Sequence, residues 1–341
     1  MIKGMIQKIR RRVVKLLIGR ELTESTNQIP QLHHTIAQLS EAVESLESQV
    51  QEQNYSLVKY MHPSKYEEWL VDKFYDMYNK ELDFNNPITF NEKLQWIKLY
   101  GADDVQTRLA DKYLVKKYVE SRIGKKYVVP LLGVYDNFDE IDFTKLPDRF
   151  AIKTNNGSRS NIIVKDKAQL NISEARQKVN YWLRHNVFTY GLEMHYKNIK
   201  PKIIIEKYIE FQEGIEDYKF YCFNGKPESL LIIADRFVDE KMAFYDMKFN
   251  KQNISILPGM KDMDIEKPRQ FDHLKDLTSK LAKELNYPFV RIDWYIDHMG
   301  EVYFGEFTFN PGAGWYFFNP EKYDKLWGDK ITLPEIKNKI P

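Results

Sequence analysis

Two acidic residues near the C-terminal end of the chain have the types and spacing of a magnesium site. Asp293 and Glu306 lie within the stretch 289–314, where apolar and polar residues alternate in two short runs joined by a turn. Because residues two apart in a strand share a face, Arg291 is expected beside Asp293 and Thr308 beside Glu306. If the runs pair as a hairpin, two hard oxygen ligands meet next to an arginine, which suits Mg²⁺ and a bound phosphate chain. The alternative is a surface hairpin with solvated acids.

A lysine followed by a small, polar loop is the second element that could do chemistry. The apolar strand predicted for 150–153 ends in Lys153, and the loop 154–161 leads into a further strand, 162–164. Backbone N–H groups and hydroxyls that follow a lysine can hold phosphates between a point charge and neutral donors. The sequence contains neither a Walker A loop nor a G-x-G-x-x-G turn, so the predicted phosphate site is of a different kind.

Two more strands are predicted between these elements. Residues 202–210 form a β-branched run that ends in charge, and residues 217–223 lead to the turn Asn224-Gly225, a strong hairpin signal. The single cysteine, Cys222, has apolar neighbours in this last run. Its context predicts a buried structural thiol rather than a reactive or zinc-binding one.

Helices are expected on either side of these strands, because apolar residues recur there with helical spacing. Thr89 and Glu92 form a capping-box pair at the start of one helix. The predicted helices cover 66–78, 89–100, 105–121, 173–185 and 271–285, and a sheet is expected to begin within 128–135.

The N-terminal residues 1–22 are predicted to form a basic amphipathic helix. Their charged side chains up to Arg20 are all basic, and their apolar residues recur at steps of three and four. The segment is too charged to span a bilayer and lacks the cleavage site of a signal peptide. We expect it to lie on an anionic membrane surface. Packing on its own domain or a partner is the alternative, and RNA binding is a weaker third.

Residues 23–61 are predicted to form a coiled coil. Their apolar residues alternate in steps of three and four, with β-branched residues at the a positions and leucine at d, a pattern that favours a parallel homodimer. The alternative is an amphipathic helix packed on the catalytic domain. The seam comprises Ile29, Leu32, Ile36, Leu39, Val43, Leu46, Val50 and Leu57.

Composition supports a folded enzyme domain with an N-terminal appendage. The 341 residues are 43% hydrophobic and 14% aromatic, enough to form a core and to exclude disorder over most of the chain. A net charge of +2 gives no overall attraction to nucleic acid, so none is expected as a partner. One cysteine excludes an intramolecular disulfide framework and fits a reducing compartment.

Four blocks of sequence, taken in order, resemble the TupA-like ATP-grasp family, named for teichuronopeptide biosynthesis. The blocks are FNEKLQWIKLYG, LADKYLVKKYV, EDYKFYCFNGKP and YFGEFTFNPGAG. The spacing of the acids is also similar to that of D-alanine–D-alanine ligases. The resemblance covers residues 62–334 and implies an α+β, ATP-grasp fold. In this fold the nucleotide lies between two sheet-bearing subdomains, and here the segments 1–22 and 23–61 precede it.

The resemblance implies ATP and Mg²⁺ as cofactors and roles for individual residues. Arg291 would face the transferred phosphate or the oxyanion, while Asp293 and Glu306 would hold the metal. Thr308 stands where related ligases usually have Asn, which leaves the third metal ligand open, and Asn310 is a spare oxygen donor on the same face.

A larger set of positions would bind the nucleotide. Glu206 would accept a hydrogen bond from the adenine amino group, and Asp217 or Glu213 would take the ribose hydroxyls. Arg159 lies where relatives favour Gly, and it and Arg236 could meet an anionic acceptor. The nucleotide-binding set is Lys153, Asn156, Gly157, Ser158, Glu206, Lys207, Ile209, Glu213, Asp217 and Lys219, of which Lys219 is also a catalytic candidate.

The chemistry that the resemblance implies is carboxylate–amine ligation through an acyl phosphate. The expected partners are a small amine or amino acid and a carboxylated sugar or polysaccharide, such as a uronic-acid-containing cell-surface polysaccharide or its precursor. The expected location is cytoplasmic, peripheral on the inner face of a bacterial membrane. The alternatives are a phosphotransferase on the same fold, which fold alone does not exclude, and a weakly active membrane-associated scaffold.

Overall fold

The computed structural model describes residues 55–158, 160–211, 215–235 and 239–335, together with isolated positions between 35 and 53. The basic helix predicted for 1–22 and nearly all of the coiled coil predicted for 23–61 lie outside these residues. The chain divides into two compact units, 1–81 and 82–341. The described part of the first unit contains η1 (Pro63–Lys65) and α3 (Tyr66–Tyr78), and α3 has the bounds that the sequence predicts.

The second unit begins with helices, and a stretch that the sequence predicts as one helix forms two. Helix α4 (Phe90–Tyr100) starts at the predicted capping box, in which Thr89 accepts from the Glu92 N–H and Glu92 accepts from the Thr89 N–H. The single helix predicted for 105–121 is wrong, because α5 (Asp104–Ala110) ends before α6 (Leu114–Ile123) begins.

Asp111 causes the interruption between α5 and α6. Its backbone is extended (φ −70°, ψ 110°), and its carboxylate accepts from the N–H groups of Tyr113 and Leu114 at 2.8 and 3.1 Å. An aspartate that bonds to nearby backbone offers an alternative to the helical ladder and caps the next helix instead. The side chain of Asn155 also donates to Asp111, at 2.9 Å, which fixes the break against the loop after the predicted lysine strand.

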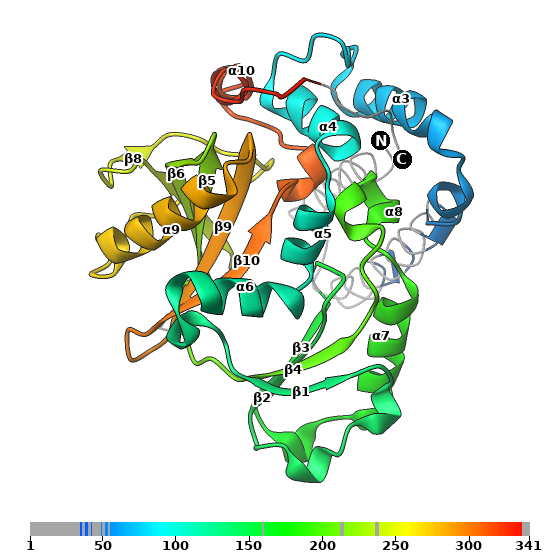
Figure 1. Ribbon diagram of the computed structural model, residues 1–341, viewed down its shortest axis with the longest axis vertical. Helices are drawn as coiled ribbons and strands as arrows, with labels where there is room; N and C mark the ends of the chain where they lie inside the picture. The colour runs from blue at the N-terminus through cyan, green and yellow to red at the C-terminus, as the bar shows by residue number, and fades with distance from the viewer. Residues whose placement is uncertain are drawn as a thin grey trace, which may run out of the picture. The chain divides into compact units, whose positions relative to one another are not determined.

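A four-stranded antiparallel sheet forms the lower part of the second unit in Figure 1. Its strands, in spatial order, are β1 (Leu131–Tyr135), β4 (Ile203–Lys207), β2 (Phe150–Thr154) and β3 (Asn161–Val164). Helix α7 (Ile172–Arg184) packs on one face, where Phe150 and Ile152 meet Val179 in a buried cluster. Because side chains alternate along a strand, Lys153 and Glu206 lie on the opposite face.

A six-stranded antiparallel sheet forms the other layer, and α9 (Phe271–Leu285) covers one face of it (Figure 1). The predicted hairpin turn is confirmed: Asn224 and Gly225 both have positive φ, 46° and 78°. The strands, in spatial order, are β10 (Val302–Thr308), β9 (Phe289–Ile296), β5 (Ile215–Phe223), β6 (Lys226–Ala234), β7 (Lys241–Tyr245) and β8 (Lys251–Gln252).

Short helices complete the described part of the second unit. They are η2 (Lys125–Tyr127), η3 (Phe138–Glu140), η4 (Phe143–Lys145), η5 (Lys167–Gln169), α8 (Phe188–Gly191), η6 (Met194–Tyr196), η7 (Pro311–Gly314) and α10 (Lys322–Gly328). The two sheets and their covering helices confirm the α+β class. Among the described residues, none of the helices is long and apolar enough to cross a bilayer.

Candidate active site

A pocket open to solvent lies between the two sheets of the second unit. Its cavity volume is about 30 Å³, within a larger space of about 410 Å³ that includes open solvent. Helix α6 and the segment 128–129 form one wall, and strands from both sheets form the rest. The lining residues are Lys112, Val115, Lys116, Val128, Val129, Lys153, Glu206, Tyr295, Phe304, Gly305 and Glu306.

The two predicted metal ligands meet across the β9–β10 hairpin. Asp293 and Glu306 are register partners, and the predicted hairpin is confirmed. A bulge precedes Glu306 at Gly305, where an added Cβ would come within 3.0 Å of the Asp293 carbonyl oxygen. The glycine therefore lets β10 approach β9 closely and turn Glu306 toward Asp293. Asp293 is 1% exposed, so it is not the solvated acid of a surface hairpin.

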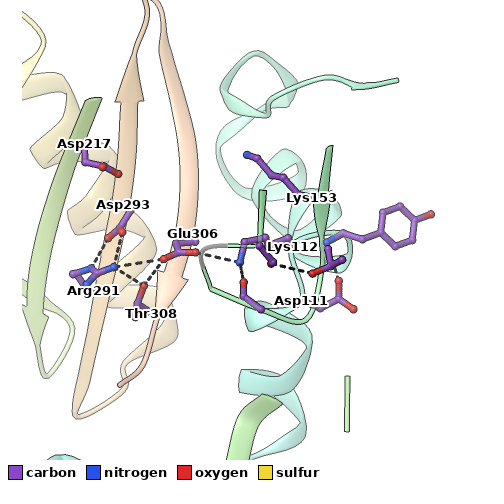
Figure 2. A network of polar contacts seen from close by, with 12 residues as sticks. Asp111, Lys112, Lys153, Asp217, Arg291, Asp293, Glu306 and Thr308 are labelled. Carbon is purple, nitrogen blue, oxygen red and sulfur yellow. Dashed lines mark hydrogen bonds and ion pairs between the residues drawn. The ribbon is translucent and has the colours of Figure 1, made fainter. Parts of the chain in front are cut away.

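Arg291 contacts both Asp293 and Glu306. Its Nε and Nη2 atoms donate to the two carboxylate oxygens of Asp293, both at 2.7 Å. Nη2 also donates to Thr308 Oγ1 at 3.0 Å and lies 3.5 Å from Glu306 Oε1 (Figure 2). The Thr308 hydroxyl in turn donates to Glu306 at 3.1 Å. All four side chains share one face of the hairpin, as the alternation of the sequence predicts.

Lys219 joins this network from the neighbouring strand β5. Its Nζ lies 2.6 Å from Asp293 Oδ2 and 3.0 Å from Asp217 Oδ1. Asp217 is 1% exposed; it contacts Lys219 beside Asp293 and is not among the residues that line the pocket. Its expected contact with ribose stays a prediction, and Glu213, the other ribose candidate, lies outside the described residues.

The positive charges around Glu306 keep it ionised. Burial disfavours its charged form, but Lys112, Lys219 and Arg291 outweigh that effect and lower the pKa of Glu306 to about 2. The Glu306 side chain is 29% exposed and faces the pocket. At neutral pH it therefore presents a carboxylate to whatever occupies the pocket.

The opposite wall of the pocket is built around Glu206. One carboxylate oxygen lies 2.5 Å from Lys116 Nζ and the other lies 2.6 Å from Lys153 Nζ. Burial disfavours the ionised form of Glu206, yet the two lysines lower its pKa to about 2. Both of its oxygens are thus paired with lysines, and the contact with adenine stays a prediction.

The sequence analysis missed Lys112 and Lys116. Both were counted within the helix predicted for 105–121, but the break at Asp111 puts Lys112 at the head of α6 and Lys116 one turn further on. Lys112 Nζ donates to the carbonyl oxygen of Gly157 at 2.5 Å and lies 3.4 Å from Glu306 Oε2 (Figure 2). The available signal was Asp111, a helix-capping residue type inside an otherwise helical run.

The predicted flap, 154–161, is anchored to the protein body at its base. Asn155, which the prediction placed in this loop without a role of its own, accepts from the Lys202 N–H at 2.6 Å and donates to Asp111. Of the predicted flap positions, Asn156 is 1% exposed, Gly157 accepts from Lys112, and Ser158 is exposed. Arg159 and Arg236, the two candidates for an anionic acceptor, lie outside the described residues.

The predicted adenine segment follows β4. The N–H of Lys207 donates to the Pro130 carbonyl at 2.9 Å, so this backbone donor is used within the fold. The Lys207 side chain is exposed and Ile209 is half-buried. Their contact with adenine stays a prediction. Cys222 is fully buried and burial raises the pKa of its thiol, so the prediction of a structural cysteine is confirmed.

Asp293 and Glu306 are oxygen donors of the kind that Mg²⁺ prefers. Both Asp293 oxygens accept from Arg291 and one also contacts Lys219, so a metal at Asp293 would have to displace these contacts and its binding stays a prediction. Asp293 and Glu306 supply two carboxylates on one face, and Mg²⁺ is commonly bound by one or two carboxylates together with substrate phosphates. Thr308 Oγ1 is adjacent to Glu306 but already bonds to Arg291. Within the part of the chain that the structure describes, no cluster of three or more His, Cys, Asp or Glu side chains could hold a metal alone.

Comparison with known proteins identifies the group to which these features belong. Residues 92–332 match the model of a family described as TupA-like ATPgrasp. A search of curated proteins found no match.

Solved structures give weak likenesses. An L-amino acid ligase from Bacillus licheniformis has 14% identity and a TM-score of 0.41, covering 66% of this chain and 49% of its own. The ATP-grasp ligase PsnB with minimal precursor, Mg and ADP has 11% identity and a TM-score of 0.38. The match covers 70% of this chain and 64% of PsnB. A D-alanine–D-alanine ligase from Helicobacter pylori has 18% identity and a TM-score of 0.35. The match covers 61% of this chain and 53% of the ligase. The chain spans less than two thirds of the length of each.

Proposed function

The chain belongs to the TupA-like ATP-grasp family, and from this premise we propose that it is an ATP- and Mg²⁺-dependent carboxylate–amine ligase. The observation that carries the proposal is the pocket between the two sheets, with lysines on one wall and Glu306 on the other, and with Asp293 as the register partner of Glu306 behind that wall. Such a pocket can hold a polyphosphate between cationic side chains and a metal.

The lysine wall would bind the nucleotide phosphates. Lys116 and Lys153 are held in place by Glu206, which fixes their amino groups toward the pocket and limits the entropy lost when phosphate binds. Lys112 would add a third cation between the flap and Glu306. Catalysis by positioning and charge stabilisation is what phosphoryl transfer requires, because the protein performs little covalent chemistry.

The acid wall would hold Mg²⁺ through Asp293 and Glu306. A bound metal would neutralise charge that develops on the phosphate oxygens. Arg291 lies between the two acids and is held by Asp293 from one side, so its guanidinium could face the transferred phosphate and the oxyanion of the acyl intermediate. Lys219, buried between Asp217 and Asp293, would orient the Asp293 carboxylate.

The reaction would join a carboxylate to an amine. A substrate carboxylate attacks the γ-phosphate of ATP to give an acyl phosphate and ADP. The amine then attacks the acyl carbon, forming the amide and releasing phosphate. We further propose a role in cell-surface polysaccharide synthesis, with a uronic acid or a related carboxylated sugar as the acceptor; it rests on the sequence resemblance described above. The N-terminal segments would bring a coiled-coil dimer to the inner face of the membrane.

ATP binding by the full chain, with and without Mg²⁺, tests the nucleotide and metal sites. Metal-dependent binding that is weakened by Asp293→Asn is expected. Release of ADP and phosphate is then measured against panels of carboxylates and amines. Phosphate release that requires an amine supports ligation, whereas a stable phosphorylated product identifies a phosphotransferase. Absence of ATP binding in either condition would favour the scaffold.

A further inference from the structure

The break between α5 and α6 and the base of the flap 154–161 are joined by buried polar contacts. We call this contact region the α6–flap joint; its members are Asp111, Lys112, Asn155 and Gly157. Asp111 is 5% exposed and Asn155 is fully buried. Neither of these two side chains lines the pocket, so neither is placed to contact a ligand in it.

Asn155 is held from two directions. Its backbone N–H donates to the Lys202 carbonyl at 3.1 Å, and its side-chain oxygen accepts from the Lys202 N–H at 2.6 Å. Its side-chain nitrogen donates to Asp111 Oδ2 at 2.9 Å and to the Lys200 carbonyl at 3.1 Å. Because these bonds fix which end of the amide donates, the Asn155 side chain has a single orientation.

Asp111 divides its carboxylate between the helix and the flap. Oδ1 accepts from backbone N–H groups at the start of α6, and Oδ2 accepts from Asn155. The next residue closes the joint from the same side. The Lys112 N–H donates to the Asn155 carbonyl at 3.2 Å, and Lys112 Nζ donates to the Gly157 carbonyl at 2.5 Å (Figure 2).

The joint connects the two elements that supply the lysines of the pocket. Lys112 and Lys116 belong to the start of α6, and Lys153 lies near the end of β2, two residues before Asn155. Cations that line one pocket repel one another, which tends to drive the two elements apart. Glu206 offsets the repulsion between Lys116 and Lys153, and the joint holds α6 against the flap.

The flap is closed at its base. The Thr154 N–H donates to the Ser160 carbonyl at 3.2 Å, and the Thr154 hydroxyl donates to Ser160 Oγ at 2.9 Å. The two ends of the loop are therefore tied together at the place where Asn155 is anchored. A displacement of Asn155 would be passed to Gly157 and to Lys112, which bonds to both.

We propose that Asp111 and Asn155 are positioning residues of the nucleotide site, which hold the α6 lysines and the flap together as one unit. Because the lysines are fixed before the phosphates arrive, less conformational freedom is lost when a phosphate chain binds. The inference rests on the proposed function, since it assigns these two residues to the binding of its nucleotide.

Binding of inorganic tripolyphosphate and of adenosine to the full chain, both without added metal, tests the joint. Asp111→Asn keeps an oxygen to cap α6 but turns its side-chain nitrogen toward that of Asn155, so it breaks the joint and retains the helix. We expect about tenfold weaker binding of tripolyphosphate. Binding of adenosine should stay unchanged, because adenosine has no phosphate for the lysines to contact. Titration calorimetry measures both, and a loss of folded structure would weaken both.

Asn155→Ala is the second variant, and it breaks the joint from the other side. Combined with Asp111→Asn, it should weaken tripolyphosphate binding no more than Asn155→Ala does alone, because both changes remove the same contact. Asp103→Asn is the matched control. Asp103 caps α5 by accepting from the Gln106 N–H at 2.6 Å and lies outside the joint, so its variant should bind tripolyphosphate like the natural chain.

Unchanged tripolyphosphate affinity in Asp111→Asn, equal weakening of adenosine binding, or additive losses in the double variant would each overturn the inference. Absence of tripolyphosphate binding by the natural chain would do the same. Failure of the ligase proposal looks different. In that case the variants weaken tripolyphosphate binding as expected, but phosphate release from ATP does not depend on an amine.

Discussion

The two sides of the pocket differ in charge, although of the acids on the six-stranded side only Glu306 is among the lining residues. On the four-stranded side, Lys116 and Lys153 surround a single acid, Glu206. On the six-stranded side, acids predominate. They are Asp217, Asp293 and Glu306, set against Lys219 and Arg291.

The difference suits the proposed nucleotide, whose phosphates and metal carry opposite charges. The cationic wall suits phosphate oxygens and the acidic wall suits the metal that neutralises them, so a bound triphosphate would have to lie between the walls. Lys112 links the two, because its amino group contacts both the Gly157 carbonyl and Glu306 (Figure 2). Neither wall alone could hold both the phosphates and the metal, because each wall would leave one sign of charge unbalanced.

The largest effect is expected on the acidic wall. Asp293→Asn or Glu306→Gln should lower metal-dependent turnover by about a thousandfold or more, because loss of a metal ligand removes several kcal/mol of charge stabilisation. Initial rates of ADP release measure the effect. Glu301→Gln, an exposed acid in the turn of the same hairpin, should keep full activity. Retained activity in Glu306→Gln would refute the assignment of the metal.

A smaller effect is expected on the cationic wall. Lys116→Met and Lys153→Met should each weaken ATP binding by about tenfold to a hundredfold, the worth of a charge-assisted contact to phosphate. Equilibrium ATP titration measures it, and Lys125→Met, on the exposed surface, is the control. ATP affinity that is unchanged in both variants would place the phosphates elsewhere.

The pH dependence of stability should also reflect the cationic wall. The folded-state pKa of Glu206, about 2, lies below its ordinary 4.5, so the ionised carboxylate stabilises the fold above pH 4.5. This contribution, about 3 kcal/mol, is lost as the pH falls from 4.5 through about 2. Urea unfolding from pH 7 downward should therefore show a steeper loss in the natural chain than in Glu206→Gln. Parallel curves would contradict the pairing with Lys116 and Lys153.

The smallest effect on the site is expected from the N-terminal segments. Deletion of residues 1–60 should yield a monomer with nearly unchanged ATP affinity, because the residues of both walls lie between 112 and 306. Sedimentation together with ATP titration tests this. A dimer that persists after deletion would contradict the predicted coiled coil.

Local pattern was enough to predict most elements of the catalytic unit. The bounds predicted for α9, 271–285, and the capping box of α4 agree with the structure because each depends on nearby residues. The prediction of a single helix over 105–121 is wrong for a local reason and for a distant one. Asp111 caps α6 through its own neighbours, but Asn155, far along the chain, holds it in place.

The sequence by itself determined which residues share a face. Alternation within 289–308 put Arg291 with Asp293 and Glu306 with Thr308, because strand geometry has a period of two. Only the tertiary structure decided which faces meet. Lys112 and Lys116 reach the pocket because α6 and the residues just before it line the same space as strands of both sheets. Contacts between such distant segments depend on packing, which no periodicity within one segment records.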